Sequence, residues 1–107
     1  MATVFTMYAG LATNEAGGNL SVVINANRAI LLDLLNLNHS EGFTLFEGLG
    51  CFEYKEEPTA IVSFIAQTRE AADALGERVA ATAAKYKEEG DQQEVWITRR
   101  EEELLIV

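Results

Sequence analysis

The residues best suited to chemistry gather within residues 43–67. The middle of this stretch holds four carboxylates, Glu47, Glu53, Glu56 and Glu57. Two aromatic side chains, Phe52 and Tyr54, stand among them and could stack on a planar base or on a cation. Gly48 and Gly50 leave the backbone bare, which permits the close approach of a ligand or of another chain segment.

Two interpretations of this acidic stretch follow from the residues themselves. It is either a solvated hairpin tip whose like charges repel modestly, or a site where one or two of the acids bind a cation, an ammonium or a sulfonium. Glu57 is the acid best placed to be held in position, because it precedes Pro58 and leads directly into an apolar strand. In a regular strand, Glu53 would lie on the opposite face from Phe52 and Tyr54.

Elsewhere in the chain, the sequence gives little evidence of a catalytic nucleophile or a metal site. There is no Walker A loop and no dinucleotide-binding glycine fingerprint. The single cysteine, Cys51, excludes an internal disulfide and a multi-cysteine metal site, and we expect it to be a small packed residue. The single histidine, His39, follows a predicted helix in a polar turn, where we expect it to be solvated. We therefore expect no bound metal and no cofactor.

Hydrophobic periodicity predicts the elements that must position these residues. Strands are expected over 3–9, 43–54, 59–66 and 94–98, and a second helix over 69–89 between Thr68 and Gly90. The first helix is expected to begin near Asn25 or Asn27, and residues 20–24 either extend it or form a short strand. The connecting segments are expected to be a flexible loop over 10–19, a tight acidic turn over 55–58 and a charged turn over 99–103.

The resulting order, βαββαβ, is typical of an α+β ferredoxin-like sandwich, and we expect residues 1–107 to form one such domain. Two helices would cover one face of a four-stranded antiparallel sheet. Residues 59–66 carry apolar side chains at both parities, as in a sheet that is buried on both faces. We therefore expect a second copy to cover the open face or an edge, with Trp96 in the core or an interface and Leu104–Val107 added to a neighbouring sheet edge.

Composition narrows the classes of partner. The net charge of −9 argues against binding a nucleic-acid backbone, which requires a basic face. No apolar run approaches the roughly 20 residues that span a bilayer, so no membrane partner is expected. The first residues lack a basic region followed by an apolar run, which favours a cytoplasmic location.

The chain resembles a known family over residues 43–98. The run from Glu47 to Glu53 with its Gly-Cys-aromatic step, the Glu56-Glu57 pair, an alanine-rich helix and Val95-Trp96-Ile97 are similar to the phage-encoded S-adenosylmethionine lyases, long called SAM hydrolases. The resemblance implies a PII-related homotrimer that binds S-adenosylmethionine between subunits. It also implies cleavage to methylthioadenosine and homoserine lactone, a lyase activity that would starve methyl-dependent restriction in the host cytoplasm.

The same resemblance implies roles for individual residues. Glu57 matches the functional acid and would bind the substrate ammonium. Phe52 stands where the family has a functional tyrosine, so Tyr54 would have to supply that hydroxyl. The backbone at Gly48 and Gly50 would approach the adenine, and Glu53 and Glu56 would complete the substrate-binding residues.

Two other functions remain open on the sequence. One is a non-catalytic PII-like trimer that binds a small nucleotide or metabolite between subunits. The other is a small acidic phage inhibitor whose surface binds a basic host protein. The acidic pair after the Gly-Cys-aromatic step favours the lyase, whereas Phe52 in the tyrosine position favours the other two.

Overall fold

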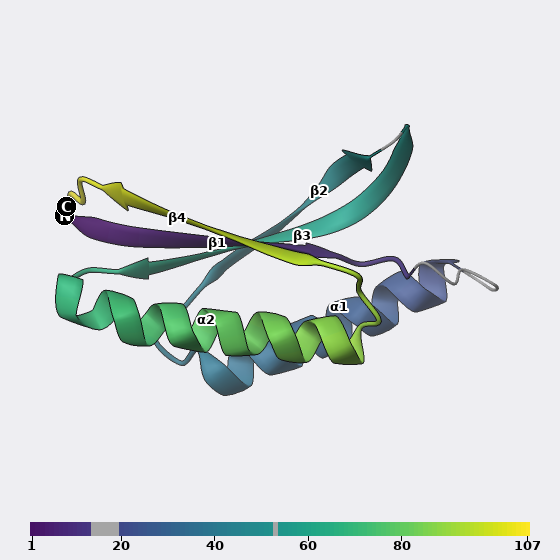
Figure 1. The fold of residues 1–107 in the computed structure, drawn as a ribbon, viewed down its shortest axis with the longest axis horizontal. Coiled ribbons are helices and arrows are strands. Elements are labelled where there is room, and N and C mark those ends of the chain that lie inside the picture. The colour runs from purple at the N-terminus through teal and green to yellow at the C-terminus, as the bar shows by residue number, and fades with distance from the viewer. Residues whose placement is uncertain (14–19, 53) are drawn as a thin grey trace.

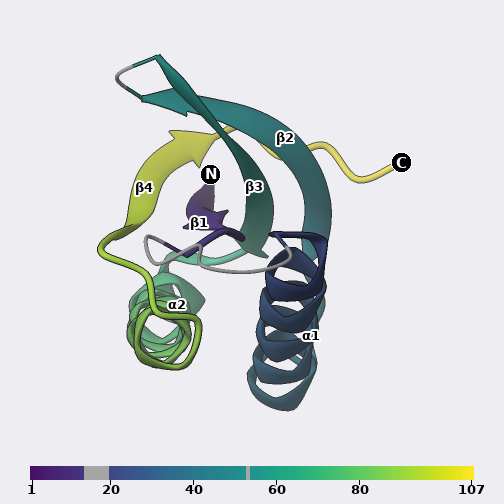
Figure 2. The same cartoon turned by 90° about the vertical axis from the view of Figure 1, so that its right-hand side faces the viewer.

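A twisted four-stranded sheet lies over two helices (Figures 1 and 2). The computed structural model describes residues 1–13, 20–52 and 54–107. The elements are β1 (Ala2–Gly10), α1 (Leu20–Asn38), β2 (Thr44–Phe52), β3 (Lys55–Ala66), α2 (Arg69–Glu89) and β4 (Val95–Glu102). This order and the antiparallel sheet order β2-β3-β1-β4 confirm the predicted ferredoxin-like α+β fold.

β1 is a central strand of the sheet, and its side chains explain that position. It pairs with β3 along one side and with β4 along the other. Its odd-numbered residues Phe5, Met7 and Ala9 are buried against the helices and form the middle of the core. On the other face Val4 and Thr6 are also buried, whereas Tyr8 is exposed.

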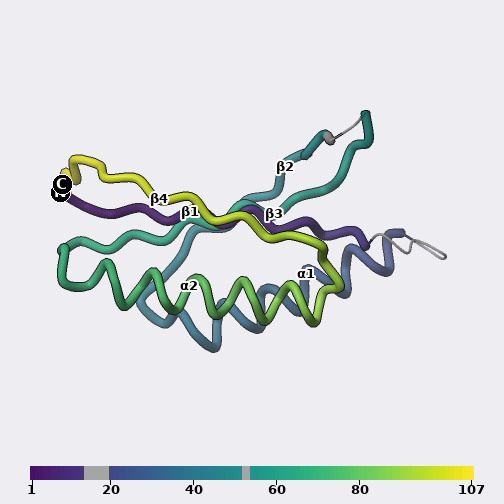
Figure 3. The backbone as a smooth tube through the Cα atoms, viewed as in Figure 1, coloured from purple at the N-terminus to yellow at the C-terminus, as the bar shows by residue number. Residues whose placement is uncertain are grey.

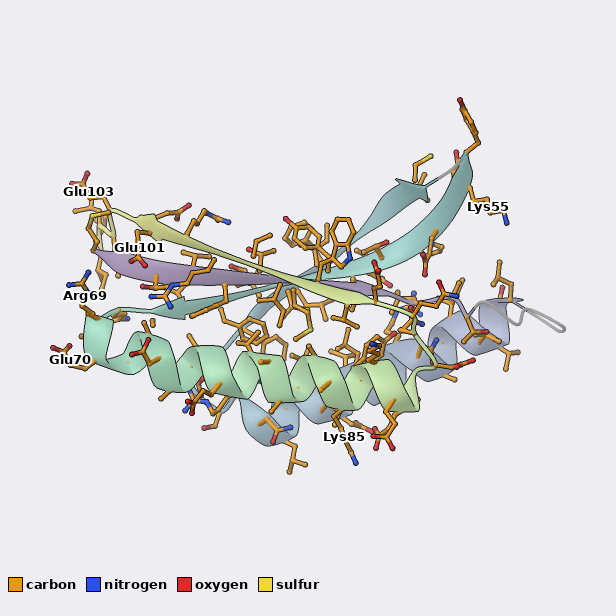
Figure 4. All side chains as sticks on the ribbon, in the orientation of Figure 1. Lys55, Arg69, Glu70, Lys85, Glu101 and Glu103 are labelled. Atoms are coloured by element: carbon orange, nitrogen blue, oxygen red, sulfur yellow. The ribbon has the colours of Figure 1, made fainter. Side chains whose placement is uncertain are left out.

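α2 forms where the sequence predicts it. Thr68 caps its first turn by accepting a hydrogen bond from the Ala71 amide at 3.3 Å, and the helix ends before Gly90. The predicted apolar stripe is buried, namely Ala72, Leu75, Val79, Ala83 and Tyr86. A Cβ at Gly76 would lie 3.0 Å from the Phe5 ring, so this glycine allows α2 to pack closely on β1. Lys85 points away from the sheet on the other side of α2 (Figure 4).

α1 begins at Leu20, earlier than the predicted start near Asn25 or Asn27. Residues 20–24 therefore extend the helix. Asn27 is no cap: its buried side-chain amide donates to the Leu11 carbonyl at 2.7 Å and to the Gly90 carbonyl at 3.4 Å. By length and mean hydropathy α1 would suffice to cross a bilayer, which the sequence analysis did not anticipate. Core helices share these properties, and Leu31, Leu34 and Leu35 are buried in the core here.

Two predicted turns are strand. Residues 55–58 belong to β3 rather than to an acidic turn, and Phe52 pairs with Lys55. The hairpin therefore turns between Phe52 and Lys55, and Tyr54 has a positive φ of 66° there. Residues 99–102 likewise continue β4, because their backbone pairs with β1 while their charged side chains reach solvent. Of the predicted loop over 10–19, Gly10 belongs to β1, residues 11–13 are irregular, and 14–19 are outside the described residues.

Three single residues differ from expectation. His39 is buried rather than solvated: its ring packs 4.6 Å from the Phe64 ring, and its Nε2 lies 2.8 Å from the Thr82 hydroxyl, because the turn after α1 folds under the sheet. Cys51 is exposed rather than packed, since it lies near the end of the projecting hairpin. Trp96 is exposed rather than in the core. Whether Trp96 lies in an interface stays a prediction.

The buried amide of Asn27 gives a direct test of the α1 assignment. Asn27→Leu removes a donor from the Leu11 and Gly90 carbonyls, so the free energy of unfolding should fall by about 1–3 kcal/mol. Asn25→Ala is the control, since Asn25 is exposed and its side-chain oxygen accepts from the exposed Arg28 guanidinium. Urea denaturation measures both variants. Equal stability of Asn27→Leu and the wild type would contradict the assignment.

Candidate functional site

The end of β1 lies beside the first residues of β3, and the two strands meet at Gly10. The Glu57 carboxylate lies over Gly10, so closely that a Cβ at Gly10 would be 2.1 Å from Glu57 Oε1. No side chain fits there, and the absence of one at Gly10 is what admits the carboxylate. Leu11 then donates its amide to the Pro58 carbonyl at 3.0 Å, which continues the β1–β3 pairing past Gly10. The hairpin and the exit of β1 are visible at the same side of the backbone trace (Figure 3).

Glu57 forms no ion pair with a described residue. Burial raises the pKa of its carboxyl above the ordinary glutamate value, and a hydrogen bond from the Ala12 backbone amide offsets only part of that effect. Within residues 1–13, 20–52 and 54–107, no lysine or arginine forms an ion pair with it. A half-buried carboxylate of this kind gains most from a cationic ligand, because the ligand would supply the missing counter-charge.

Three side chains from other elements hold the segment under Glu57. The Tyr86 hydroxyl of α2 donates to the Gly10 carbonyl at 2.5 Å. Asn27 of α1 donates to Leu11, and Gln92, just after α2, donates to Ala12 at 2.7 Å. Burial, and then the Glu57 charge, raise the pKa of Tyr86, so its hydroxyl keeps its proton and remains a donor. Three consecutive carbonyls are thus each fixed by one side-chain donor.

The other predicted site residues lie along the hairpin. Gly50 pairs with Glu57 across β2 and β3, and a Cβ there would lie 2.8 Å from the Thr59 hydroxyl. Gly48 pairs with Thr59. Glu56 and Tyr54 are exposed, and Tyr54 is fully so. Phe52 is the last residue of β2, and Glu53 is outside the described residues.

The structure therefore brings only some of the predicted residues together. Gly50 and Glu57 are neighbours, whereas Tyr54 sits at the hairpin tip beside Lys55, which projects beyond the body of the molecule (Figure 4). Glu47 is engaged elsewhere, in a 2.7 Å ion pair with Arg28 of α1. The roles given to these residues stay predictions.

Sequence reasoning missed Gly10, Asn27, Tyr86 and Gln92. The signals were present but had other interpretations: Gly10 ends an apolar strand, and Tyr86 belongs to the apolar stripe of α2. Tyr86 and Gln92 stand 76 and 80 residues from their partners on the β1 exit, so only the fold reveals the contacts.

The face of the sheet opposite the helices carries one apolar row across all four strands. Phe46, Ile61, Tyr8 and Trp96 pair in register from β2 to β4. The two end residues of this row are half exposed or more, Phe46 at 54% and Trp96 at 63%. A second copy of the chain on this face, as the sequence analysis expects, would cover them.

No family model and no curated protein matches the chain. Among solved structures it is similar to a phage SAM lyase in complex with S-methyl-5'-thioadenosine, with 12% identity and a TM-score of 0.59 over 94% of this chain and 81% of that one. The same kind of enzyme in the apo state gives 12% identity and 0.59 over 92% and 78%. A de novo designed protein, Foldit4, gives 12% and 0.58 over 96% and 100%. A natural enzyme and a designed protein thus match equally well, and the likeness shows the fold alone.

Replacing Glu57 should change the free energy of unfolding in a way that depends on pH. The folded-state pKa is raised, so the contribution of Glu57 is fully present below the unfolded pKa and is lost as pH rises through the folded pKa. Glu57→Gln should therefore be at least as stable as the wild type at neutral pH, and this advantage should shrink as pH falls toward the unfolded pKa. Denaturant titrations across pH measure the difference.

Glu77→Gln, a change at an exposed helix position, is the matched control. A Glu57→Gln protein that is less stable than the wild type at neutral pH, with a gap that widens as pH rises, would show that the carboxylate is stabilised in its charged form. That result would contradict the site geometry.

Proposed function

We propose that this protein is an S-adenosylmethionine lyase that cleaves its substrate to 5'-methylthioadenosine and homoserine lactone. The observation that carries the proposal is the half-buried Glu57 carboxylate over Gly10, which has no cationic partner in the described part of the chain. S-adenosylmethionine presents two cationic groups, an ammonium and a sulfonium. Glu57 would bind the ammonium and so supply the contact that orients the amino-acid part of the substrate.

The proposed reaction suits a site built from acceptors. A carboxylate oxygen of the substrate attacks its own γ-carbon, the bond from that carbon to sulfur breaks, and the electron pair leaves on sulfur. The sulfonium thereby becomes a neutral thioether, and the carboxylate becomes the lactone ester. Because opposite charges disappear toward the transition state, the protein needs mainly to hold the folded substrate conformer and to exclude water.

The rest of the site would form around that contact. Gly48 and Gly50 leave bare backbone on β2, next to Thr59 and Glu57, where an adenine could lie. Phe52, Glu53, Tyr54 and Glu56 complete the proposed substrate-binding residues. Tyr54 is fully exposed in the hairpin turn, three residues before Glu57. Tyr54 would therefore contact a substrate on Glu57 most readily across a subunit boundary.

We further propose a PII-like homotrimer with the substrate between subunits. The exposed apolar row on the open sheet face supports such an assembly, because exposed apolar patches of this kind commonly mark interfaces. The fold is similar to that of phage SAM lyases, and this similarity supports the proposed activity only through the shared architecture. In the biological setting that we propose, a phage chain would act in the host cytoplasm and remove the methyl donor on which restriction depends.

A second candidate uses the same site without catalysis. The full exposure of Tyr54, together with Phe52 in the position of a functional tyrosine, favours a PII-like trimer that binds a small nucleotide or metabolite through Glu57. Ligand-induced stabilisation without turnover would identify this function, because a ligand that binds only the folded state raises the melting temperature.

Product analysis tests the proposed activity. The purified protein, incubated with S-adenosylmethionine, should release methylthioadenosine and homoserine lactone above the buffer blank, as followed by mass spectrometry. Glu57→Gln removes the charge that binds the ammonium and should lower kcat/KM by about 10-fold to 100-fold, the range for a charged hydrogen bond of 1.5–3 kcal/mol. Glu77→Gln should leave it unchanged.

Two results would contradict the proposal. Absence of both products with a folded protein would exclude the lyase and leave the binding module. Wild-type turnover by folded Glu57→Gln would keep the lyase but reject Glu57 as the residue that binds the ammonium.

A further inference from the structure

The side-chain oxygens of Gln92 and Glu57 both lie close to Gly10. A Cβ built on Gly10 would lie 2.1 Å from Glu57 Oε1 and 2.7 Å from Gln92 Oε1. Both oxygens therefore lie within 2.7 Å of one point in space above Gly10. The two side chains come from distant parts of the chain, β3 and the segment after α2, and they converge only because β1 ends between them.

The orientation of the Gln92 amide follows from its partners. Its Nε2 donates to the Ala12 carbonyl at 2.7 Å and to the Gly90 carbonyl at 2.9 Å. Both partners are acceptors, so the nitrogen and not the oxygen must face them. The opposite flip would set an oxygen against two carbonyl oxygens and is excluded by repulsion. Oε1 is thus the end of the amide that faces Gly10.

The side-chain donors around this point are all directed at backbone carbonyls. Tyr86, Asn27 and Gln92 direct their donors to the carbonyls of Gly10, Leu11 and Ala12. What remains above Gly10 is the Glu57 carboxylate, which accepts one hydrogen bond from the Ala12 amide, and the amide oxygen of Gln92, which only accepts. A ligand at this point must donate to both oxygens, and a positive charge on it would neutralise Glu57.

A primary ammonium fits these requirements. It carries three N–H donors and one positive charge on a small tetrahedral nitrogen, so it can reach both oxygens at ordinary hydrogen-bond distances. A metal ion fits less well, because the described residues contain no group of three or more histidine, cysteine, aspartate or glutamate side chains that could hold one.

We infer that Glu57 and Gln92 together form a primary-ammonium site above Gly10, in which Gln92 supplies the second acceptor and selects an amine that bears N–H donors. This inference rests on the proposed function in so far as the ammonium of S-adenosylmethionine would be the natural occupant. The pair of oxygens defines the ligand class irrespective of turnover.

Two cations of equal charge test the site without S-adenosylmethionine. Methylammonium carries three N–H donors, whereas tetramethylammonium carries none. In NMR titrations of the wild-type protein, methylammonium should shift the Glu57 carboxyl and the Gln92 side-chain amide resonances saturably. Tetramethylammonium should need at least about tenfold higher concentration for the same shift, since it loses the hydrogen bonds to both oxygens. Equal responses, or no saturable response to methylammonium, would overturn the inference.

A substitution separates the part played by Gln92. Gln92→Leu should weaken methylammonium binding about threefold to tenfold, as expected for one neutral acceptor. Gln93→Leu, at the exposed neighbouring position, is the matched control and should bind as the wild type does. Unchanged binding in folded Gln92→Leu would overturn the role of Gln92. If Gln92→Leu does not fold, the comparison of the two cations in the wild type decides alone.

Failure of the ammonium site and failure of the proposed lyase activity give different results. Saturable methylammonium binding without product from S-adenosylmethionine would support the ammonium site and reject the lyase. Turnover with no discrimination between the two cations would support the lyase and reject the site.

Discussion

The exit of β1 imposes the constraint on which the rest of the structure depends. The Leu11 amide still donates to the Pro58 carbonyl, and the chain then leaves the sheet, so the carbonyls of Gly10, Leu11 and Ala12 accept from side chains instead. Buried backbone carbonyls need donors. Tyr86 of α2, Asn27 of α1 and Gln92 each provide one, so a single three-residue segment ties both helices to the sheet.

The same constraint creates the candidate site. Because the donors approach the segment at its carbonyls, the bare Cα of Gly10 is left for the Glu57 carboxylate. Most of the other acids that the structure describes lie in solvent, and Glu41 and Glu47 pair with Arg78 and Arg28 at 2.7 Å each. In a chain with a net charge of −9, Glu57 is distinguished by its partial burial and by having no counter-charge among the residues that the structure describes. That combination links the packing of β1 to a preference for cationic ligands.

The fold was predictable where local signals agree with tertiary packing. Thr68, the apolar stripe and Gly90 define α2 from the sequence, and short apolar runs define the strands. Prediction failed where one residue type serves two purposes. Asparagine commonly caps helices, but Asn27 is a buried donor inside one, and the acidic run before Pro58 is a strand because its backbone pairs with β2. His39 is polar in sequence, yet the turn after α1 carries it beneath Phe64.

The candidate site was predictable only in part. Glu57 could be identified because it leads into an apolar strand beside a cluster of acids. Gln92 and Tyr86 could not be identified, since no residue near them in the sequence indicates a hydrogen-bond partner some 80 residues away, at the end of another element. Their importance depends on which oxygen and which hydrogen face Gly10, and that is a property of the folded chain alone.

The pKa of the Glu57 carboxyl, followed by ¹³C NMR in the unliganded protein, tests the central claim most directly. A carboxylate that is desolvated over Gly10 without a counter-charge should titrate above the ordinary glutamate range of about 4.3. A pKa at or below that range would show that Glu57 is solvated or already neutralised, and it would contradict the account of the site.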